Sequence, residues 1–190
     1  MELDYIDNKT FEKENYTASP FPKGEYEQCT FIRCDFSNTD LSDNKFIDCS
    51  FQSCNLSLAK LKNTALRDIT FKDCKLLGLH FENCNEFGLA FSFDNCTLDH
   101  TSFYGRKLKK TIFKNTSLKH ADFTDADLTS SSFDNCDLSN AQFDNTTLEK
   151  ADLRTAFNYA LDPDQNRIKK AKFALPGVIA LLSKYDIEIG

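Results

Sequence analysis

The chain has 190 residues, a formal net charge of −6 at pH 7, and contents of 41% hydrophobic and 27% charged residues. This composition is typical of one globular domain with a sizeable core, and the negative charge argues against a nucleic-acid-binding protein, which needs a basic face for phosphates. No apolar run approaches the about 20 residues of a membrane span, so we expect no membrane association.

Residues 1–10 (MELDYIDNKT) lack the basic and then apolar layout of a secretory signal peptide. We therefore expect a cytoplasmic protein, in a reducing compartment where its eight cysteines remain free thiols. The same ten residues are expected to form a short strand and an N-terminal cap, because the first unit of any stacked fold has unpaired backbone groups to cover.

Residues 11–157 contain a sustained five-residue repeat. Phe, Tyr or Leu occupies every fifth position up to residue 81: Phe11, Tyr16, Phe21, Tyr26, Phe31, Phe36, Leu41, Phe46, Phe51, Leu56, Leu61, Leu66, Phe71, Leu76 and Phe81. After a slip of two residues near 82–92 the series resumes: Phe93, Leu98, Phe103, Leu108, Phe113, Leu118, Phe123, Leu128, Phe133, Leu138, Phe143, Leu148 and Leu153. Neither the helix period of 3.6 nor the strand period of 2 explains these spacings. The pattern predicts a repeat architecture whose units are five residues long.

The position two before each central residue is small in most units, with exceptions such as Ile69, Leu79 and Arg106. Most of the cysteines lie at this position: Cys29, Cys34, Cys49, Cys54, Cys74, Cys96 and Cys136, and Cys84 also if the first register is extended to residue 86. A buried free cysteine behaves as a small hydrophobic residue, whereas a zinc site needs CxxC-like pairs, which the sequence lacks. We therefore predict cysteines that pack in the core, and neither a metal nor a cofactor.

The three histidines, His80, His100 and His120, are spaced twenty residues apart, as a column of metal ligands would be. The slip near 82–92 separates His80 from the other two. We expect His100 and His120 to stack on adjacent turns of the fold, as a solvated pair rather than a metal site, because two imidazoles lack a third ligand. The sequence has no P-loop, GxSxG or HExxH motif, so we do not expect an enzyme.

Charge is uneven along the chain. Residues 104–120 contain six basic residues and no acid, and residues 121–149 contain seven acids and no base. The candidate partner-binding residues are acids of the second segment: Asp122, Asp125, Asp127, Asp134, Asp137 and Asp144. An interaction surface and an ordinary solvated surface both remain open for them.

Residues 158–190 depart from the regular pattern. We expect a loop around Pro163, a final partial coil containing Ile168 and Phe173, and a helix followed by a short strand that includes Ile187 and Ile189. The helix has an apolar stripe too large for its own surroundings, which predicts a cap and a homodimer contact. The candidate interface residues are Leu175, Val178, Ile179, Leu182, Tyr185 and Ile187.

Residues 121–153 (ADFTDADLTSSSFDNCDLSNAQFDNTTLEKADL) follow the unit A(D/N)LXX, and over residues 11–153 the chain resembles the pentapeptide-repeat family. The resemblance implies an all-β fold: a right-handed quadrilateral parallel β-helix of about seven coils, with four pentapeptides per coil and a C-terminal capping α-helix. The residue types agree, because every twentieth residue forms a column of like side chains: Phe11, Phe31, Phe51, Phe71, Phe93, Phe113, Phe133 and Leu153. Such coils would stack at the ~4.8 Å spacing of strands.

In the gyrase-protecting members of this family (the Qnr and MfpA types), a negatively charged rod imitates duplex DNA, and a C-terminal helix forms a twofold dimer. The tail LLSKYDIEIG is similar in layout to that of the Qnr type, whereas the near absence of projecting loops is closer to the MfpA type. The resemblance implies a homodimer that binds DNA gyrase or topoisomerase IV and modulates it or protects it from quinolones. The alternative is a protein-interaction scaffold with another partner, because DNA carries one phosphate per ~1.7 Å and a charge of −6 is a thin imitation.

Overall fold

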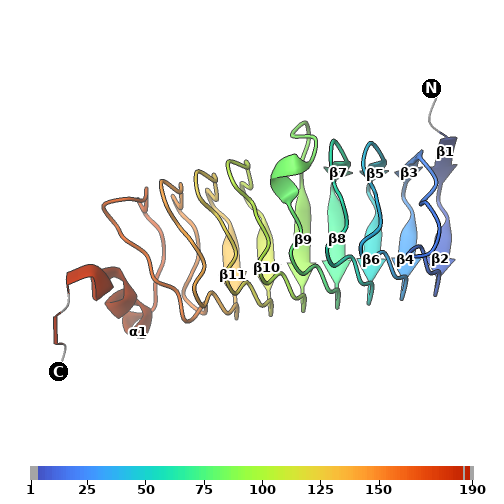
Figure 1. Ribbon diagram of the computed structural model, residues 1–190. Coiled ribbons are helices and arrows are strands. Elements are labelled where there is room, and N and C mark those ends of the chain that lie inside the picture. The colour runs from blue at the N-terminus through green and yellow to red at the C-terminus, as the bar shows by residue number, and fades with distance from the viewer. Residues whose placement is uncertain (1–3, 186, 189–190) are drawn as a thin grey trace.

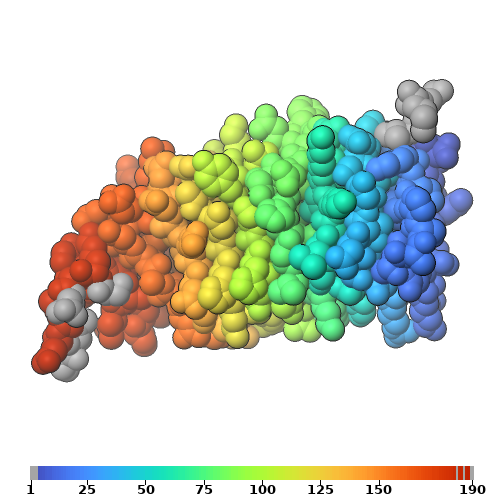
Figure 2. Space-filling model, viewed as in Figure 1, coloured from blue at the N-terminus to red at the C-terminus, as the bar shows by residue number. Residues whose placement is uncertain are grey.

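The computed structural model describes residues 4–185 and 187–188 of the chain. These residues form a rod in which successive coils stack side by side from the N-terminal to the C-terminal end (Figures 1 and 2). The strands are β1 (Asp4–Asp7), β2 (Thr10–Glu12), β3 (Gly24–Glu27), β4 (Thr30–Ile32), β5 (Lys45–Ile47), β6 (Ser50–Gln52), β7 (Ala65–Arg67), β8 (Ile69–Lys72), β9 (Phe91–Asp94), β10 (Ile112–Lys114) and β11 (Ser132–Asp134). The helices are η1 (Phe81–Asn83), α1 (Leu175–Val178) and η2 (Ile179–Tyr185).

The strands form two parallel sheets, in the orders β1-β3-β5-β7 and β11-β10-β9-β8-β6-β4-β2. Phe31 is paired with Phe51, and Phe51 with Phe71, so neighbouring strands are one twenty-residue coil apart. Isolated parallel bridges with the same offset, such as Lys107 to Asp127, hold the rest of the coils together. The predicted right-handed quadrilateral β-helix of about seven coils is therefore confirmed, together with its short C-terminal helix.

We number the four faces of the rod by the column of residues at their centres. Face I is centred on Phe11, Phe31, Phe51, Phe71, Phe93, Phe113, Phe133 and Leu153. Face II is centred on Tyr16, Phe36, Leu56, Leu76, Leu98, Leu118 and Leu138. Face III is centred on Phe21, Leu41, Leu61, Phe81, Phe103, Phe123 and Phe143, and face IV on Tyr26, Phe46, Leu66, Leu108, Leu128 and Leu148.

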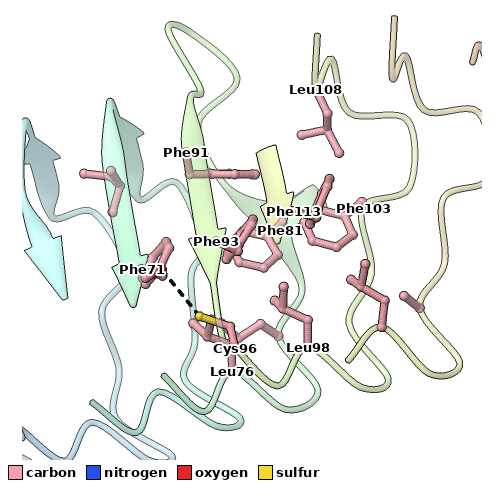
Figure 3. Packing of buried hydrophobic residues seen from close by; sticks show 14 of the residues in the cluster. Phe71, Leu76, Phe81, Phe91, Phe93, Cys96, Leu98, Phe103, Leu108 and Phe113 are labelled. Atoms are coloured by element: carbon pink, nitrogen blue, oxygen red, sulfur yellow. Dashed lines mark hydrogen bonds between the residues drawn. The ribbon is translucent and has the colours of Figure 1, made fainter. Parts of the chain in front are cut away.

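The core consists of these inward side chains, stacked coil upon coil (Figure 3). On face I the rings of Phe93 and Phe113 are stacked with centroids 5.3 Å apart. On face III the rings of Phe103 and Phe123 are 5.1 Å apart and inclined by only 2°. Rings of adjacent faces meet edge to face, as Phe113 and Phe123 do at 6.1 Å. Both arrangements are favoured by aromatic quadrupoles, so identical residues at identical positions reinforce one another.

Most corners are made by a residue in the left-handed conformation, two positions after the central residue. Asn38, Asp48 and His100 have φ values of 57°, 51° and 57°. Asn and Asp tolerate this region better than most side chains. Aspartates just before a central residue also brace the turn, since Asp35 Oδ1 accepts a hydrogen bond of 2.9 Å from the backbone N–H of Ser37. The polar residues between the apolar columns therefore make the bends of the coil.

The cysteines are buried thiols of the small-residue columns, as predicted. Cys54 Sγ donates to the carbonyl oxygens of Phe31, one coil away, and of Gln52, at 3.3 and 3.4 Å. Burial raises the pKa of the Cys49 and Cys136 thiols to about 12. These groups pack and remain protonated.

The slip near 82–92 is an insertion on face IV. Phe71 pairs with Phe93, so this coil has 22 residues where its neighbours have twenty. Phe91 is buried, and its ring contacts those of Phe81 and Phe93 at 5.0 and 5.1 Å. The two extra residues therefore lengthen the loop between η1 and β9, which projects beside β9 in Figure 1. Phe87, within this loop, is exposed.

The C-terminal helix closes the open end of the last coil. Ala180 and Leu181 pack against the core. A Cβ atom on Gly177 would lie 2.1 Å from Tyr159 Oη, so only glycine permits this approach. The helix is α-helical for one turn and then 3-10, which fits a segment with Pro176, Gly177 and no side-chain N-cap. Residues 187–188 are not in a strand, and Ile189 lies outside the described residues. Within the described chain, every helix is too short or too polar to cross a membrane.

Candidate protein interface

Only the outside of the rod is available for recognition, because stacked side chains fill its interior. On each face the outward residues are those just before the central residue and the two after it. Since these positions repeat every twenty residues, each face presents its own columns of charge. The four faces therefore differ in their charge, which the net charge of the whole chain does not reveal.

The C-terminal half of face III is acidic. Its four blocks, residues 102–105, 122–125, 142–145 and 162–165, contain no Lys or Arg. Their acids are Asp122, Asp125, Asp144, Asp162 and Asp164, which we call the acidic stripe. Adjacent coils are in register here, since the backbone N–H of Asp125 donates to the carbonyl oxygen of Asp144 at 2.9 Å.

The carboxylates of the stripe are held by short local contacts. Asp122 Oδ1 accepts a hydrogen bond of 2.9 Å from the backbone N–H of Thr124. Asp125 Oδ1 accepts one of 2.5 Å from Asn145 Nδ2, on the next coil. A hydrogen bond to Asp125 also raises the pKa of the Tyr104 hydroxyl. The carboxylates of Asp122 and Asp125 are thus oriented by neighbouring groups of the same face.

The stripe brings together three of the six predicted aspartates, Asp122, Asp125 and Asp144. The other three lie on other faces, because each successive five-residue unit forms the next of the four faces of the coil. Asp127 is on face IV, where Lys109 Nζ lies 3.2 Å from its Oδ2. Asp137 is on face II, 3.3 Å from Lys119 Nζ, and Asp134 is on face I, where Thr155 Oγ1 donates to it at 2.9 Å.

Asp162 and Asp164 were missed by the sequence interpretation, which placed them in a loop outside the repeat. The backbone N–H of Thr146 donates to Asn166 Oδ1 at 2.9 Å, so residues 159–165 cross face III one coil beyond Phe143. The block one coil after residues 142–145 is residues 162–165, and extending the repeat by this one coil would have located both acids. Lys184 of η2 pairs with Asp162 at 2.6 Å and with Asp164, and the first contact lowers the pKa of Asp162.

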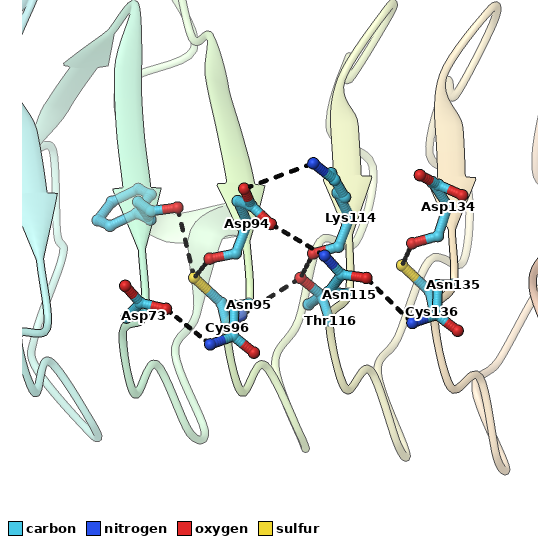
Figure 4. A network of polar contacts seen from close by, with 11 residues as sticks. Asp73, Asp94, Asn95, Cys96, Lys114, Asn115, Thr116, Asp134, Asn135 and Cys136 are labelled. Atoms are coloured by element: carbon cyan, nitrogen blue, oxygen red, sulfur yellow. Dashed lines mark hydrogen bonds and ion pairs between the residues drawn. The ribbon is translucent and has the colours of Figure 1, made fainter.

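Face I has alternating charges that cancel (Figure 4). Its outward column contains Lys72, Asp94, Lys114, Asp134 and Arg154. Lys114 Nζ lies 3.8 Å from Asp94 Oδ2. Neighbouring Asn side chains form a ladder, in which Asn135 Nδ2 donates to Asn115 Oδ1 at 3.0 Å. This face is electrically neutral and satisfies its own polar groups.

The histidines are arranged as predicted. The rings of His100 and His120 stack with centroids 4.7 Å apart and an inclination of 2°. His80 is on face III, where its Nδ1 lies 2.7 Å from Glu82 Oε1. Among the described residues, no three His, Cys, Asp or Glu side chains are grouped as metal ligands.

The predicted dimer residues lie at the C-terminal end. Leu175 is 89% exposed, and the other members are exposed or half-buried: Val178, Ile179, Leu182, Tyr185 and Ile187. Beside them is an apolar hollow of about 460 Å³, lined by Phe157, Tyr159 and Ile179 among others. Phe157 had not been predicted for this surface, because sequence alone did not place the helix beside its coil.

Comparisons with known proteins agree with this architecture. The sequence model of the family described as "Pentapeptide repeat region" matches residues 25–92 and 79–153. A trypsin-treated structure of QnrB1, a plasmid-mediated fluoroquinolone resistance protein, is similar with a TM-score of 0.62 and 20% identity, over 100% of both chains. The full-length QnrB1 structure gives a TM-score of 0.57 and 20% identity, over 96% of this chain and 100% of that chain. No curated protein sequence matches the chain.

Proposed function

Because the chain belongs to the pentapeptide-repeat family, we propose that it is a non-enzymatic protein-binding rod whose partner is a type II topoisomerase. DNA gyrase or topoisomerase IV would bind it in place of duplex DNA. The expected consequence is altered supercoiling, or protection of the enzyme from a quinolone. The acidic stripe on face III is the observation that carries this proposal.

The stripe has a charge density of the right order for a DNA mimic. Each coil advances the rod by ~4.8 Å, and the stripe presents one or two carboxylates per coil between Asp122 and Asp164, of which Asp162 and Asp164 are both paired with Lys184. One strand of DNA carries a phosphate per ~3.4 Å of axis. The net charge of −6 understates this match, because basic residues are concentrated on other faces. The similarity in fold over its whole length to QnrB1, a fluoroquinolone resistance protein, supports a role in protection from quinolones.

A supercoiling assay tests the proposal. Purified protein at micromolar concentration should change supercoiling by gyrase, or restore it in the presence of a quinolone. The double variant Asp122→Lys with Asp144→Lys should weaken the effect, because it reverses the centre of the stripe. The control, Asp94→Lys with Asp134→Lys, makes the same change of charge on face I and should act as the wild type does. No effect of the wild-type protein, or equal loss in both variants, would refute the proposal.

The protein is also proposed to form a homodimer through its C-terminal helix. The exposed side chains of Leu175 and Ile179, beside the hollow at Phe157, would be covered by a second copy. Such a dimer would place the two acidic stripes near its centre. Ile179→Glu should then yield monomers in sedimentation measurements, whereas an unchanged mass would exclude this interface.

A second candidate function is a scaffold with a different protein partner. Two surfaces favour it because neither resembles DNA: the neutral face I, and the C-terminal half of face IV. That half consists of residues 107–110, 127–130, 147–150 and 167–170, which contain seven basic residues and two acids. Absence of any effect on supercoiling would leave this function as the better one.

A further inference from the structure

Face IV is divided into two oppositely charged halves by the insertion at Phe87. Four blocks precede the insertion (residues 5–8, 25–28, 45–48 and 65–68) and four follow it (residues 107–110, 127–130, 147–150 and 167–170). The acidic half contains Asp7, Glu25, Glu27, Asp48 and Asp68, against Lys45 and Arg67. The basic half contains Lys107, Lys109, Lys110, Lys150, Arg167, Lys169 and Lys170, against Asp127 and Glu149.

Few of these charges are neutralised within the chain. In the acidic half Lys45 Nζ lies 2.9 Å from Glu25 Oε2, and in the basic half Lys109 Nζ lies 3.2 Å from Asp127 Oδ2. The remaining basic residues of the basic half are exposed and have no ion pair within the described residues. Two blocks of unpaired charge of opposite sign therefore lie on one flat surface.

The insertion places an aromatic knob between the halves. Phe87 is 74% exposed, whereas most of the other phenylalanines are buried. The Arg67 guanidinium lies 5.0 Å from the centre of its ring, and Arg67 Nε donates to the carbonyl oxygen of Phe87 at 3.3 Å. Gly88, with φ +69°, brings the loop against the Arg67 side chain. The ring is thus held in place while facing solvent.

A hollow lies next to the knob. It has a volume of about 370 Å³ and is lined by Leu89, Phe91, Thr70 and Lys110, among others. Knob and hollow both lie at the midpoint of face IV, with four blocks on either side. A twofold axis that crosses the rod at this point would bring the Phe87 rings of the two copies against each other, with the two hollows opposite one another beside them.

We propose that face IV binds face IV of a second copy of this chain in antiparallel orientation. The twofold axis places block 65–68 opposite block 107–110, and block 5–8 opposite block 167–170. Asp68 then faces the block of Lys110, Asp7 faces the block of Lys169, and the two Phe87 rings meet at the axis. This is an isologous, self-complementary contact, on a different face from the acidic stripe and from the C-terminal helix.

A second copy fits this surface because the chain itself has the complementary charge order at equal distances from the knob. Nine blocks at ~4.8 Å give a contact about 40 Å long. With a width of about 10 Å it covers roughly 400 Å² per chain, about half of what a standard specific interface buries on each partner. The association should therefore be weak and strongly dependent on salt.

Charge-swap variants test the pairing by sedimentation velocity. The base-reversed variant is Lys110→Glu with Lys169→Glu, and the acid-reversed variant is Asp7→Lys with Asp68→Lys. Wild-type mass should increase with concentration at about 20 mM salt and lose this increase at about 500 mM. Each variant alone should lose the increase, and an equimolar mixture of the two should regain it, because every pair of opposed residues that was substituted is then of opposite sign.

Two further variants control for indirect effects. Phe87→Ser should weaken the association at least tenfold, whereas Leu58→Ser, which removes an exposed leucine from another corner, should not. Lys62→Glu with Lys72→Glu makes the same charge change away from face IV and should behave as the wild type. The proposal is wrong if wild-type mass does not depend on salt and concentration, or if the mixture of charge-swap variants stays dissociated. A C-terminal dimer would persist at high salt and is thereby distinguished.

Discussion

Replacing Phe113 by alanine perturbs the stacked core at its most regular point. The side chain is fully buried, and its ring stacks on Phe93 at 5.3 Å and on Phe133 at 4.9 Å. Truncation of a buried Phe to Ala costs about 3–5 kcal/mol, and loss of two aromatic stacks adds about 0.5–1.5 kcal/mol each. We therefore expect Phe113→Ala to lower the free energy of unfolding by about 5 kcal/mol.

The free energy of unfolding can be measured by urea titration followed by far-UV circular dichroism. Phe113→Leu should cost only about 1.5 kcal/mol, because a leucine of similar volume fills the space, and Leu153 occupies the same column further along. Phe87→Ala is the matched control at an exposed position and should change stability by less than about 0.5 kcal/mol at high salt. If Phe113→Ala costs no more than Phe87→Ala, the central residues do not form the core as described.

The remaining predictions concern single groups. Burial raises the pKa of Cys136 to about 12, so this thiol should be inert to a disulfide reagent at pH 8 in the native protein and react once urea unfolds it; rapid native reaction would contradict its burial. Arg154, bonded to Asp152 at 2.7 Å, lowers the pKa of Asp152 to about 2. Arg154→Ala should therefore be less stable than wild type above about pH 4. In an acid titration this difference should decrease below about pH 4 and be lost as the pH falls through about 2, where Asp152 becomes protonated; a constant difference would exclude the linkage. The buried side chain of Asn44 accepts a hydrogen bond of 2.9 Å from the backbone N–H of Gly24, so Asn44→Leu should cost about 1–3 kcal/mol in urea titration, and a neutral effect would mean that the N–H finds another partner.

The coil geometry could be predicted because the repeat is local and is regular on both sides of the slip near 82–92. A central Phe or Leu at each fifth residue implies an inward side chain. Because one coil has twenty residues, residues twenty apart in the sequence are predicted to stack, as Phe31 does on Phe51 and His100 on His120. The same arithmetic assigns each charge to a face. Applied only as far as residue 153, it could not include Asp162 in the acidic stripe.

The interruptions could not be predicted in the same way. The sequence indicates two extra residues near 82–92, but the direction of the bulge depends on which aromatic ring fills the gap on face IV. Phe91 enters the core and Phe87 is excluded, although both have the same side chain. The C-terminal contacts depend on tertiary structure too, since Gly177 is required by Tyr159 and Lys184 reaches Asp162 across 22 residues.

Competition between this protein and duplex DNA for purified DNA gyrase tests the central claim most directly. If the acidic stripe occupies the DNA-binding surface, the apparent Kd of the protein for gyrase should rise in proportion to the concentration of a short duplex, and Asp122→Lys with Asp144→Lys should abolish binding. Binding that is unaffected by DNA, or by reversal of these two aspartates, would contradict the account.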